Sequence, residues 1–178
     1  MFTRSFFKLT TSTTTTTIPK NRINFINLIR LQSTFKLNNN SIVSNYSKSP
    51  ILKFTNEHEW ISIHPDGTGF IGITNYASDA LGDATFIELP IQQIGEEIKN
   101  GETISSVESV KSASDIYSPV DGKIIEVNEK LDDSPDLINS DPMGDGWIVK
   151  IKIDNNDPTL NDLMDVDSYK TFVENSDH

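Results

Sequence analysis

Between residues 58 and 153, short apolar segments alternate with turn sequences, and this spacing restricts the possible fold more than any other feature of the chain. The segments Trp60–Ile63 and Phe70–Ile73 are too short for ordinary helices, and Pro65-Asp66-Gly67 separates them as a turn. Asn100-Gly101 gives a hairpin-type turn signal, and Asp121-Gly122 gives another turn signal. Roughly seven short strands with turns every 8–12 residues indicate a small all-β sandwich or barrel.

Local signals also predict helices and the last strand. Thr74 is expected to cap a short helix that Gly82 ends. Residues 147–153 are expected to close the sheet, with Ile and Lys alternating between a buried and a solvent-exposed face. Asp157-Pro158 and Asp165 are expected to begin two C-terminal helices. The acidic connection 129–146 is expected to be mostly loop, and the other strands are expected near 86–89, 104–110, 116–117 and 124–127.

The first 50 residues differ from the rest in charge and complexity. They contain seven basic residues, no acidic residue and the threonine run Thr13–Thr17. Such a composition is typical of an organelle transit peptide. We therefore interpret residues 1–48 as a mitochondrial transit peptide that precedes a single domain, 49–178, with cleavage between Leu31 and Lys48. The alternative is a tail without a targeting role.

Residues 51–178 hold eight lysines, no arginine and 26 acidic residues, a net charge of −18. This charge opposes binding to nucleic acid or to an anionic membrane, because contacts to phosphate need Lys and Arg. We expect neither partner, and no segment approaches the roughly 20 apolar residues of a membrane-spanning helix. An acidic surface suits short-lived docking on basic partner proteins.

The absence of cysteine excludes a disulfide and a thiolate metal site within this chain. His58-Glu59 does not match a zinc-protease motif, because His64 follows His58 by six positions and not by four. We predict no metal site and no catalytic residue. Any thiol chemistry has to be carried by an attached group.

Lys111 lies in the segment Glu108–Asp115, which is expected to join two strands, and the small residues Ser112, Ala113 and Ser114 follow it. A lysine at a hairpin tip presents its amine to solvent and leaves room for a modifying enzyme. A swinging cofactor needs such an amine for an amide bond. The alternative is that Lys111 is an ordinary exposed turn lysine.

Four segments of the chain resemble the glycine cleavage system H proteins. They are HEWISI (58–63), GDATFIELP (82–90), VESVKSASDIYSPVDGKIIEVNEKL (107–131) and DPMGDGWIVKIKI (141–153). The resemblance extends over roughly residues 53–174. Biotin domains are similar in fold but place Met on both sides of the lysine, and lipoyl domains of 2-oxo acid dehydrogenases commonly place Asp before it. Here Val110 and Ser112 flank Lys111.

The resemblance implies a mainly β fold, a barrel-sandwich hybrid of the lipoyl/biotinyl-domain-like kind, with short helices of which two are C-terminal. It implies that 49–178 is a lipoyl-carrier domain with lipoic acid covalently bound at Lys111. The implied function is a non-catalytic shuttle of the mitochondrial matrix. It would carry the aminomethyl group from glycine decarboxylase (P protein) to aminomethyltransferase (T protein), and dihydrolipoamide dehydrogenase (L protein) would reoxidise it. Lipoyl-attaching enzymes are further implied partners.

The resemblance also suggests a cleft that holds the loaded arm, with carboxylates facing its cationic cargo. Aligning the HEW segment and the lysine motif with the family places Glu59 and Asp115 at these positions. The alternative is that both are exposed carboxylates of an acidic domain.

Two other functions remain compatible with these residues. The chain could be a biotin or 2-oxo acid dehydrogenase carrier module, which a different mass at Lys111 would reveal. It could also donate or relay lipoyl groups to other mitochondrial complexes, in which case deleting its gene would lower the lipoylation of other proteins.

Overall fold

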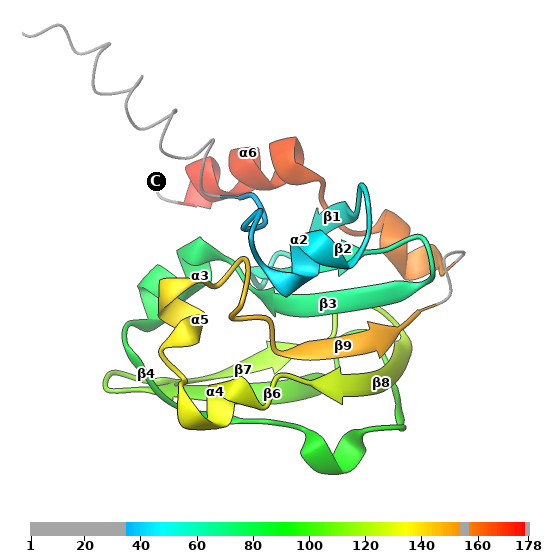
Figure 1. The fold of residues 1–178 in the computed structure, drawn as a ribbon. Coiled ribbons are helices and arrows are strands. Elements are labelled where there is room, and N and C mark those ends of the chain that lie inside the picture. Colours follow the sequence, from blue (N-terminus) through cyan, green and yellow to red (C-terminus); the bar gives the residue numbers. More distant parts are fainter. Residues whose placement is uncertain (1–34, 154–156, 177–178) are drawn as a thin grey trace, which may run out of the picture.

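The computed structural model describes residues 35–153 and 157–176. Residues 1–34 of the predicted transit peptide lie outside this part. The boundary predicted at residue 48 falls within the described residues and stays a prediction. Two sheets form the described part of the molecule, with short helices at one end and on one face (Figure 1). The mainly β architecture expected from the sequence is therefore confirmed.

All strand pairs are antiparallel. The larger sheet has six strands in the order β1 (Ile51–Phe54), β2 (Glu59–Ile63), β3 (Thr68–Ile73), β9 (Val149–Lys152), β8 (Gly122–Val127) and β5 (Glu97–Ile98). The smaller sheet has the order β4 (Ala84–Glu88), β6 (Thr103–Ser109) and β7 (Ala113–Tyr117). The strands β1 and β5 were not predicted. The five-residue strand β7 extends further toward Lys111 than expected.

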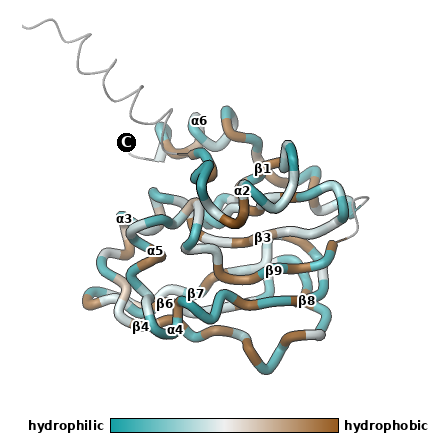
Figure 2. Tube along the Cα trace, viewed as in Figure 1, coloured by the Kyte–Doolittle hydropathy of each residue, from teal (hydrophilic) through white to brown (hydrophobic). Residues whose placement is uncertain are grey.

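Both faces of the larger sheet are buried at its centre, since every residue of β2 and β3 is buried. Alternate side chains, such as Ile61 and Ile71, pack in an aliphatic core with residues of the smaller sheet. The opposite side chains, including Trp60 and Phe70, belong to a second cluster that is rich in aromatic rings. Figure 2 shows apolar residues along the strands of both sheets.

The second cluster is covered by two helices, α2 (Ile42–Tyr46) and α6 (Val166–Ser176), as Figure 1 shows. This cover explains one wrong prediction. Lys150 of β9 was expected on a solvent-exposed face but is buried, and it forms an ion pair with Glu126. Its Nζ atom lies over the rings of Phe70 and Trp147, at 4.9 and 5.8 Å from their centroids.

The helix α3 (Asn75–Leu81) confirms the predicted capping signals. Thr74 accepts a hydrogen bond from the Ala77 amide, and Gly82 follows the last turn with φ +79°. A positive φ favours glycine, which has no Cβ to collide with the backbone. The helix thus ends at the position that the sequence predicts.

Other helix predictions need correction. The connection 129–146 contains two one-turn helices, α4 (Lys130–Asp133) and α5 (Leu137–Ser140), where mostly loop was expected. Each buries a single apolar side chain, Leu131 or Ile138. After Asp157 comes a 3-10 turn, η2 (Pro158–Asn161), in place of the expected α-helix, and α6 begins as predicted after Asp165. A second 3-10 turn, η1 (Ile91–Gln93), follows β4. Within the described residues, no helix is long and apolar enough to cross a membrane.

Candidate functional site

Lys111 lies at the tip of the hairpin formed by β6 and β7, and its side chain is exposed. The tip is tied together by Ser109. Its amide donates to the Ser112 carbonyl at 2.8 Å, and its hydroxyl oxygen accepts from the amides of Lys111 and Ser112, both at 3.1 Å. The small Ser109 and Ser112 thus make a closed turn from which Lys111 projects. The neighbouring Val110 is also exposed, at 75%.

The amine of Lys111 is close to the end of α3. A Cβ atom placed on Gly82 would lie 3.3 Å from Lys111 Nζ and 3.4 Å from its Cδ and Cε atoms. The absence of a side chain at Gly82 therefore lets the Lys111 side chain lie against the helix end. Because Gly82 also has a positive φ, two separate constraints favour glycine at this position.

A pocket of about 240 Å³ opens beside this hairpin, between the β1–β2 turn, α3 and the strands β6 and β7. Its walls are mainly apolar, and it includes Ser112, the residue after Lys111. Its other lining residues are Glu57, His58, Glu59, Ile73, Ala77, Ala80, Leu81, Val107, Ser114, Asp115 and Ile116. Three separate parts of the sequence thus converge on one small cleft next to an exposed amine.

Glu59 is the buried carboxylate of this cleft, with an exposed fraction of 2%. Its Oε1 accepts a hydrogen bond from the Tyr117 amide at 3.1 Å, and its Oε2 accepts one from the Thr55 hydroxyl. Two carboxylate oxygens offer about four acceptor positions. Glu59 is therefore held in place and retains capacity for a further donor. It is not the exposed carboxylate that the alternative interpretation described.

Asp115 lines the same pocket from β7, but its side chain is exposed. The structure thus brings both predicted carboxylates to one cleft, with Glu59 buried in the wall and Asp115 open to solvent. Asp115 also borders a second pocket.

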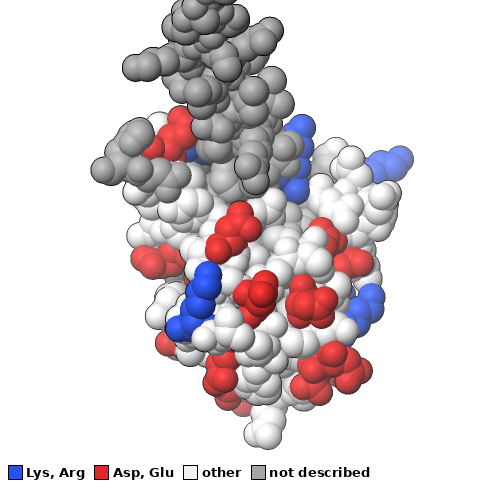
Figure 3. All heavy atoms as spheres, turned by 90° about the vertical axis from the view of Figure 1, so that its left-hand side faces the viewer, with Lys and Arg blue, Asp and Glu red and all other residues white. Residues whose placement is uncertain are grey.

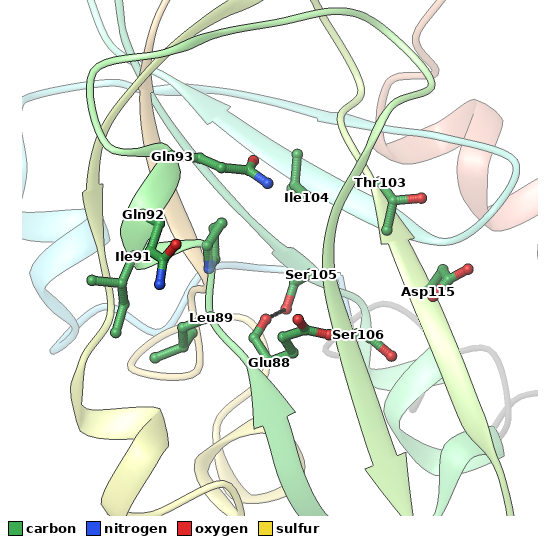
Figure 4. A pocket seen from close by; sticks show the side chains of 11 residues that line it. Glu88, Leu89, Ile91, Gln92, Gln93, Thr103, Ile104, Ser105, Ser106 and Asp115 are labelled. Carbon is green, nitrogen blue, oxygen red and sulfur yellow. Dashed lines mark hydrogen bonds between the residues drawn. The ribbon is translucent and has the colours of Figure 1, made fainter.

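The second pocket is larger, about 570 Å³, and lies over β4, η1 and β6 (Figure 4). Ser105 donates a hydrogen bond to the Glu88 carbonyl at 2.8 Å at its floor. Neither Lys111 nor Glu59 lines this pocket, so its size alone does not make it the candidate site. We assign the site to the smaller cleft, because the buried carboxylate of Glu59 and Ser112, the residue after Lys111, both line it.

The place of His58 in the cleft was not predicted from the sequence, where its spacing was weighed only against a metal-binding motif. His58 lines the pocket in a left-handed conformation, φ +74°, which is unusual for a residue other than glycine. Its Nδ1 lies 2.7 Å from the Tyr169 hydroxyl of α6, which also lies 3.0 Å from the Thr74 hydroxyl. Burial lowers the pKa of His58 against the opposing effect of Glu57, and burial raises the pKa of the Tyr169 phenol.

The surface around the site is acidic. On the face that carries α3, Asp and Glu side chains outnumber those of Lys (Figure 3). Within 35–153 and 157–176, no group of three or more His, Asp and Glu side chains is arranged to hold a metal ion.

Comparison with known proteins gives a consistent result. Residues 52–176 match the family model described as glycine cleavage H-protein. The chain is 47% identical over 150 residues to the mitochondrial glycine cleavage system H protein of Saccharomyces cerevisiae, an alignment that covers 82% of this chain and 87% of the yeast protein. It is 52% identical over 122 residues to the glycine cleavage system H protein of Coprothermobacter proteolyticus, covering 68% of this chain and 94% of the relative. The crystal structure of a glycine cleavage system H protein from Mycobacterium marinum superposes with a TM-score of 0.60 at 34% identity, covering 71% of this chain and 99% of the other.

Proposed function

The chain belongs to the glycine cleavage H-protein family, and from this we propose that it carries a lipoyl group on Lys111 as the shuttle of a glycine cleavage system. Proteins of this family are carriers and not catalysts, so the chain is a non-enzymatic component. The observation that best supports the proposal is the exposed amine of Lys111, which a closed hairpin tip presents beside an apolar cleft.

The cleft fits an attached lipoyl group in size and chemistry. Its volume of about 240 Å³ is below the roughly 300–1,000 Å³ of ordinary ligand pockets. It therefore suits a slender aliphatic arm, for which Ile73, Leu81 and Val107 supply apolar walls. When bound, lipoate supplies the thiol–disulfide chemistry that a chain without cysteine lacks.

The carried aminomethyl group would bear a positive charge, and in this proposal the carboxylates of Glu59 and Asp115 pair with it. Glu59 is fixed by its hydrogen bonds from Tyr117 and Thr55, so it needs no reorganisation to accept from an ammonium. Asp115 borders the same cleft from solvent. In this proposal both hold the loaded arm, and the apolar walls keep water from the cargo.

The proposed partners are the three enzymes of the system and an enzyme that attaches lipoate. The protein takes up the aminomethyl group at glycine decarboxylase (P protein) and delivers it at aminomethyltransferase (T protein). Dihydrolipoamide dehydrogenase (L protein) then reoxidises the carrier. The acidic surface in Figure 3 supports brief docking on basic surfaces of these enzymes. The mitochondrial yeast relative and the basic, acid-free N-terminus support a location in the mitochondrial matrix.

The test is the mass of the intact protein purified from mitochondria of cells that produce it. We expect one lipoyl group, and fragmentation should assign it to Lys111. The variant Lys111→Arg keeps the charge but offers no lysine amine, so it should remain unmodified and inactive in a reconstituted glycine cleavage assay. A biotin group, a lipoyl group on another lysine, or full activity of the variant would refute the proposal.

A further inference from the structure

The first residues that the structure describes, 35–49, lie outside the part of the chain that matches the family model, which begins at residue 52. We call this segment the strap. It crosses the outer face of the six-stranded sheet and includes α2 (Figure 1). Almost all of the strap belongs to the predicted transit peptide, 1–48, yet it packs against the domain.

The strap contributes to the aromatic cluster. Phe35 is 2% exposed, and its ring centroid lies 4.8 Å from that of Tyr169 and 6.1 Å from that of Phe54, in edge-to-face arrangements. Val43 of α2 is fully buried in the same cluster. Side chains that are buried in this way contribute packing that a removable tail does not.

Hydrogen bonds fix the strap at its beginning. The Asn38 amide donates to the Met143 carbonyl at 3.0 Å, and the Asn38 side chain donates to the Asp141 carboxylate at 2.9 Å. The Ser41 hydroxyl then caps α2 by accepting from the Ser44 amide at 3.3 Å. The two bonds of Asn38 connect the strap to the turn that leads into β9.

The end of the strap covers buried polar groups. The Tyr46 hydroxyl donates to the Asp66 carboxylate at 3.0 Å, and the Ser47 hydroxyl lies 2.6 Å from His64 Nδ1. His64 is 1% exposed, and the ring of Tyr46 lies 5.4 Å from the Nζ atom of Lys150. Without the strap, His64 would lose its Ser47 partner and Lys150 its cover on this side.

We propose that the strap remains in the mature protein and that the import leader is removed N-terminal to Phe35. The removal is hydrolysis of one peptide bond by a processing peptidase: one water is consumed, the leader ends in a new carboxylate, and the mature chain begins with a new amino group. The existence of a leader rests on the location proposed above. The charge pattern agrees, because five of the seven basic residues of the first 50 precede residue 35 and only Lys36 and Lys48 fall in the strap.

The strap also stabilises, indirectly, the cleft beside Lys111, which we call the arm cleft. Phe35 packs on Tyr169, whose hydroxyl bonds His58 in the cleft wall and Thr74 at the start of α3. A cut within the strap would remove one side of the packing around Tyr169. The position of the cut therefore affects the site and not only the N-terminus.

The first test determines the N-terminus of the protein recovered from mitochondria of cells that express all 178 residues, by N-terminal labelling and intact mass. A chain that begins at or before Phe35 and has lost basic residues of the leader supports the proposal. A chain that begins after Phe35, or that keeps all five basic residues that precede residue 35, overturns it. The same sample reports the state of Lys111, so that a lipoylated chain lacking the strap would refute this proposal alone, and an unmodified chain with the strap would refute the carrier function alone.

The second test asks whether the strap packs in solution, using the full chain. Phe35→Ala removes a buried ring and should lower the midpoint of thermal unfolding by about 10 °C. The matched control is Ile42→Ala, which truncates an apolar side chain of α2 that is 50% exposed and should leave the midpoint nearly unchanged. Equal midpoints for the two variants would contradict a packed strap.

Discussion

The hydroxyl of Tyr169 lies 2.7 Å from Nδ1 of His58, which joins the C-terminal helix α6 to the wall of the arm cleft. The two residues are 111 positions apart in the sequence. The same hydroxyl lies 3.0 Å from that of Thr74, the cap of α3, which forms another wall of the cleft. The buried hydroxyl of Tyr169 therefore links two walls of the cleft, although Tyr169 does not line the pocket itself.

We predict that Tyr169→Phe lowers the free energy of unfolding by about 2 kcal/mol, because the ring still packs but both hydrogen bonds are lost, and one of the two partners, Thr74, is buried. Urea denaturation followed by circular dichroism measures this change. Tyr117→Phe is the matched control, since the Tyr117 hydroxyl makes no hydrogen bond to the described residues, and it should change stability by less than about 0.5 kcal/mol. Similar effects of the two substitutions would contradict a structural role for the Tyr169 hydroxyl.

We predict that Gly82→Ala impairs attachment of the lipoyl group at Lys111. The new Cβ would lie 3.3 Å from Lys111 Nζ and would displace the side chain from the end of α3. The control Gly95→Ala also places a side chain at a positive φ, +96°, but has no atom within 4 Å of the added Cβ. Both variants should be destabilised by about 1 kcal/mol, whereas only Gly82→Ala should be lipoylated more slowly by a purified ligase. Equal rates for the two variants would rule out a role for this close approach.

Local features of the fold were predictable because their causes are local. Thr74 and Gly82 mark the ends of α3 by capping and by backbone conformation. The burial of Lys150 was not predictable, because Tyr46 of the strap covers it from 104 positions away in the sequence, a distance over which strand alternation carries no information. The one-turn helices α4 and α5 are too short to show a helical period.

The candidate site was predictable only where a motif marks it. The residues around Lys111 predicted a hairpin tip, and the structure has one. The family alignment named Glu59 and Asp115, but their residue types do not reveal that one is buried and the other exposed. The contact between His58 and Tyr169 depends on the packing of α6, which no pattern in either segment indicates.

We predict that the protein loses stability when the pH falls below about 6.5. Burial lowers the pKa of both His58 and His64 from 6.5. The negative charge of Glu57 opposes the shift at His58. At His64 the charge of Asp66 opposes the shift, and the charge of Lys150 adds to it. In this range the unfolded chain binds more protons than the folded chain, so the free energy of unfolding falls as the pH is lowered. The carboxyl groups of Asp66, Asp121 and Asp165, whose pKa values are lowered from 3.8, titrate at more acidic pH.

Urea denaturation at pH 7.5 and pH 5.5 tests this prediction, with His64→Gln as the informative variant. His64 is 1% exposed and lies within hydrogen-bond distance of Ser47 and Ser62. Removing it should reduce the difference in stability between the two pH values, whatever its effect at pH 7.5. A wild-type protein equally stable at both pH values would show that neither histidine is protonated more readily on unfolding.

The last prediction concerns retention of the cargo. In Glu59→Gln the side chain still fills its buried position but loses the charge that would pair with an ammonium, so the carried aminomethyl group should be released about tenfold faster, the effect of roughly 1.4 kcal/mol in a rate. Asp115→Asn should have a smaller effect, because its side chain is exposed and water screens its charge.

Formaldehyde released from the loaded carrier in the absence of aminomethyltransferase measures the rate. Glu97→Gln, on β5 outside the cleft lining, removes one negative charge from the surface and should leave the rate unchanged. If Glu97→Gln accelerates release as much as Glu59→Gln does, the overall acidity of the domain, and not the buried carboxylate, retains the cargo.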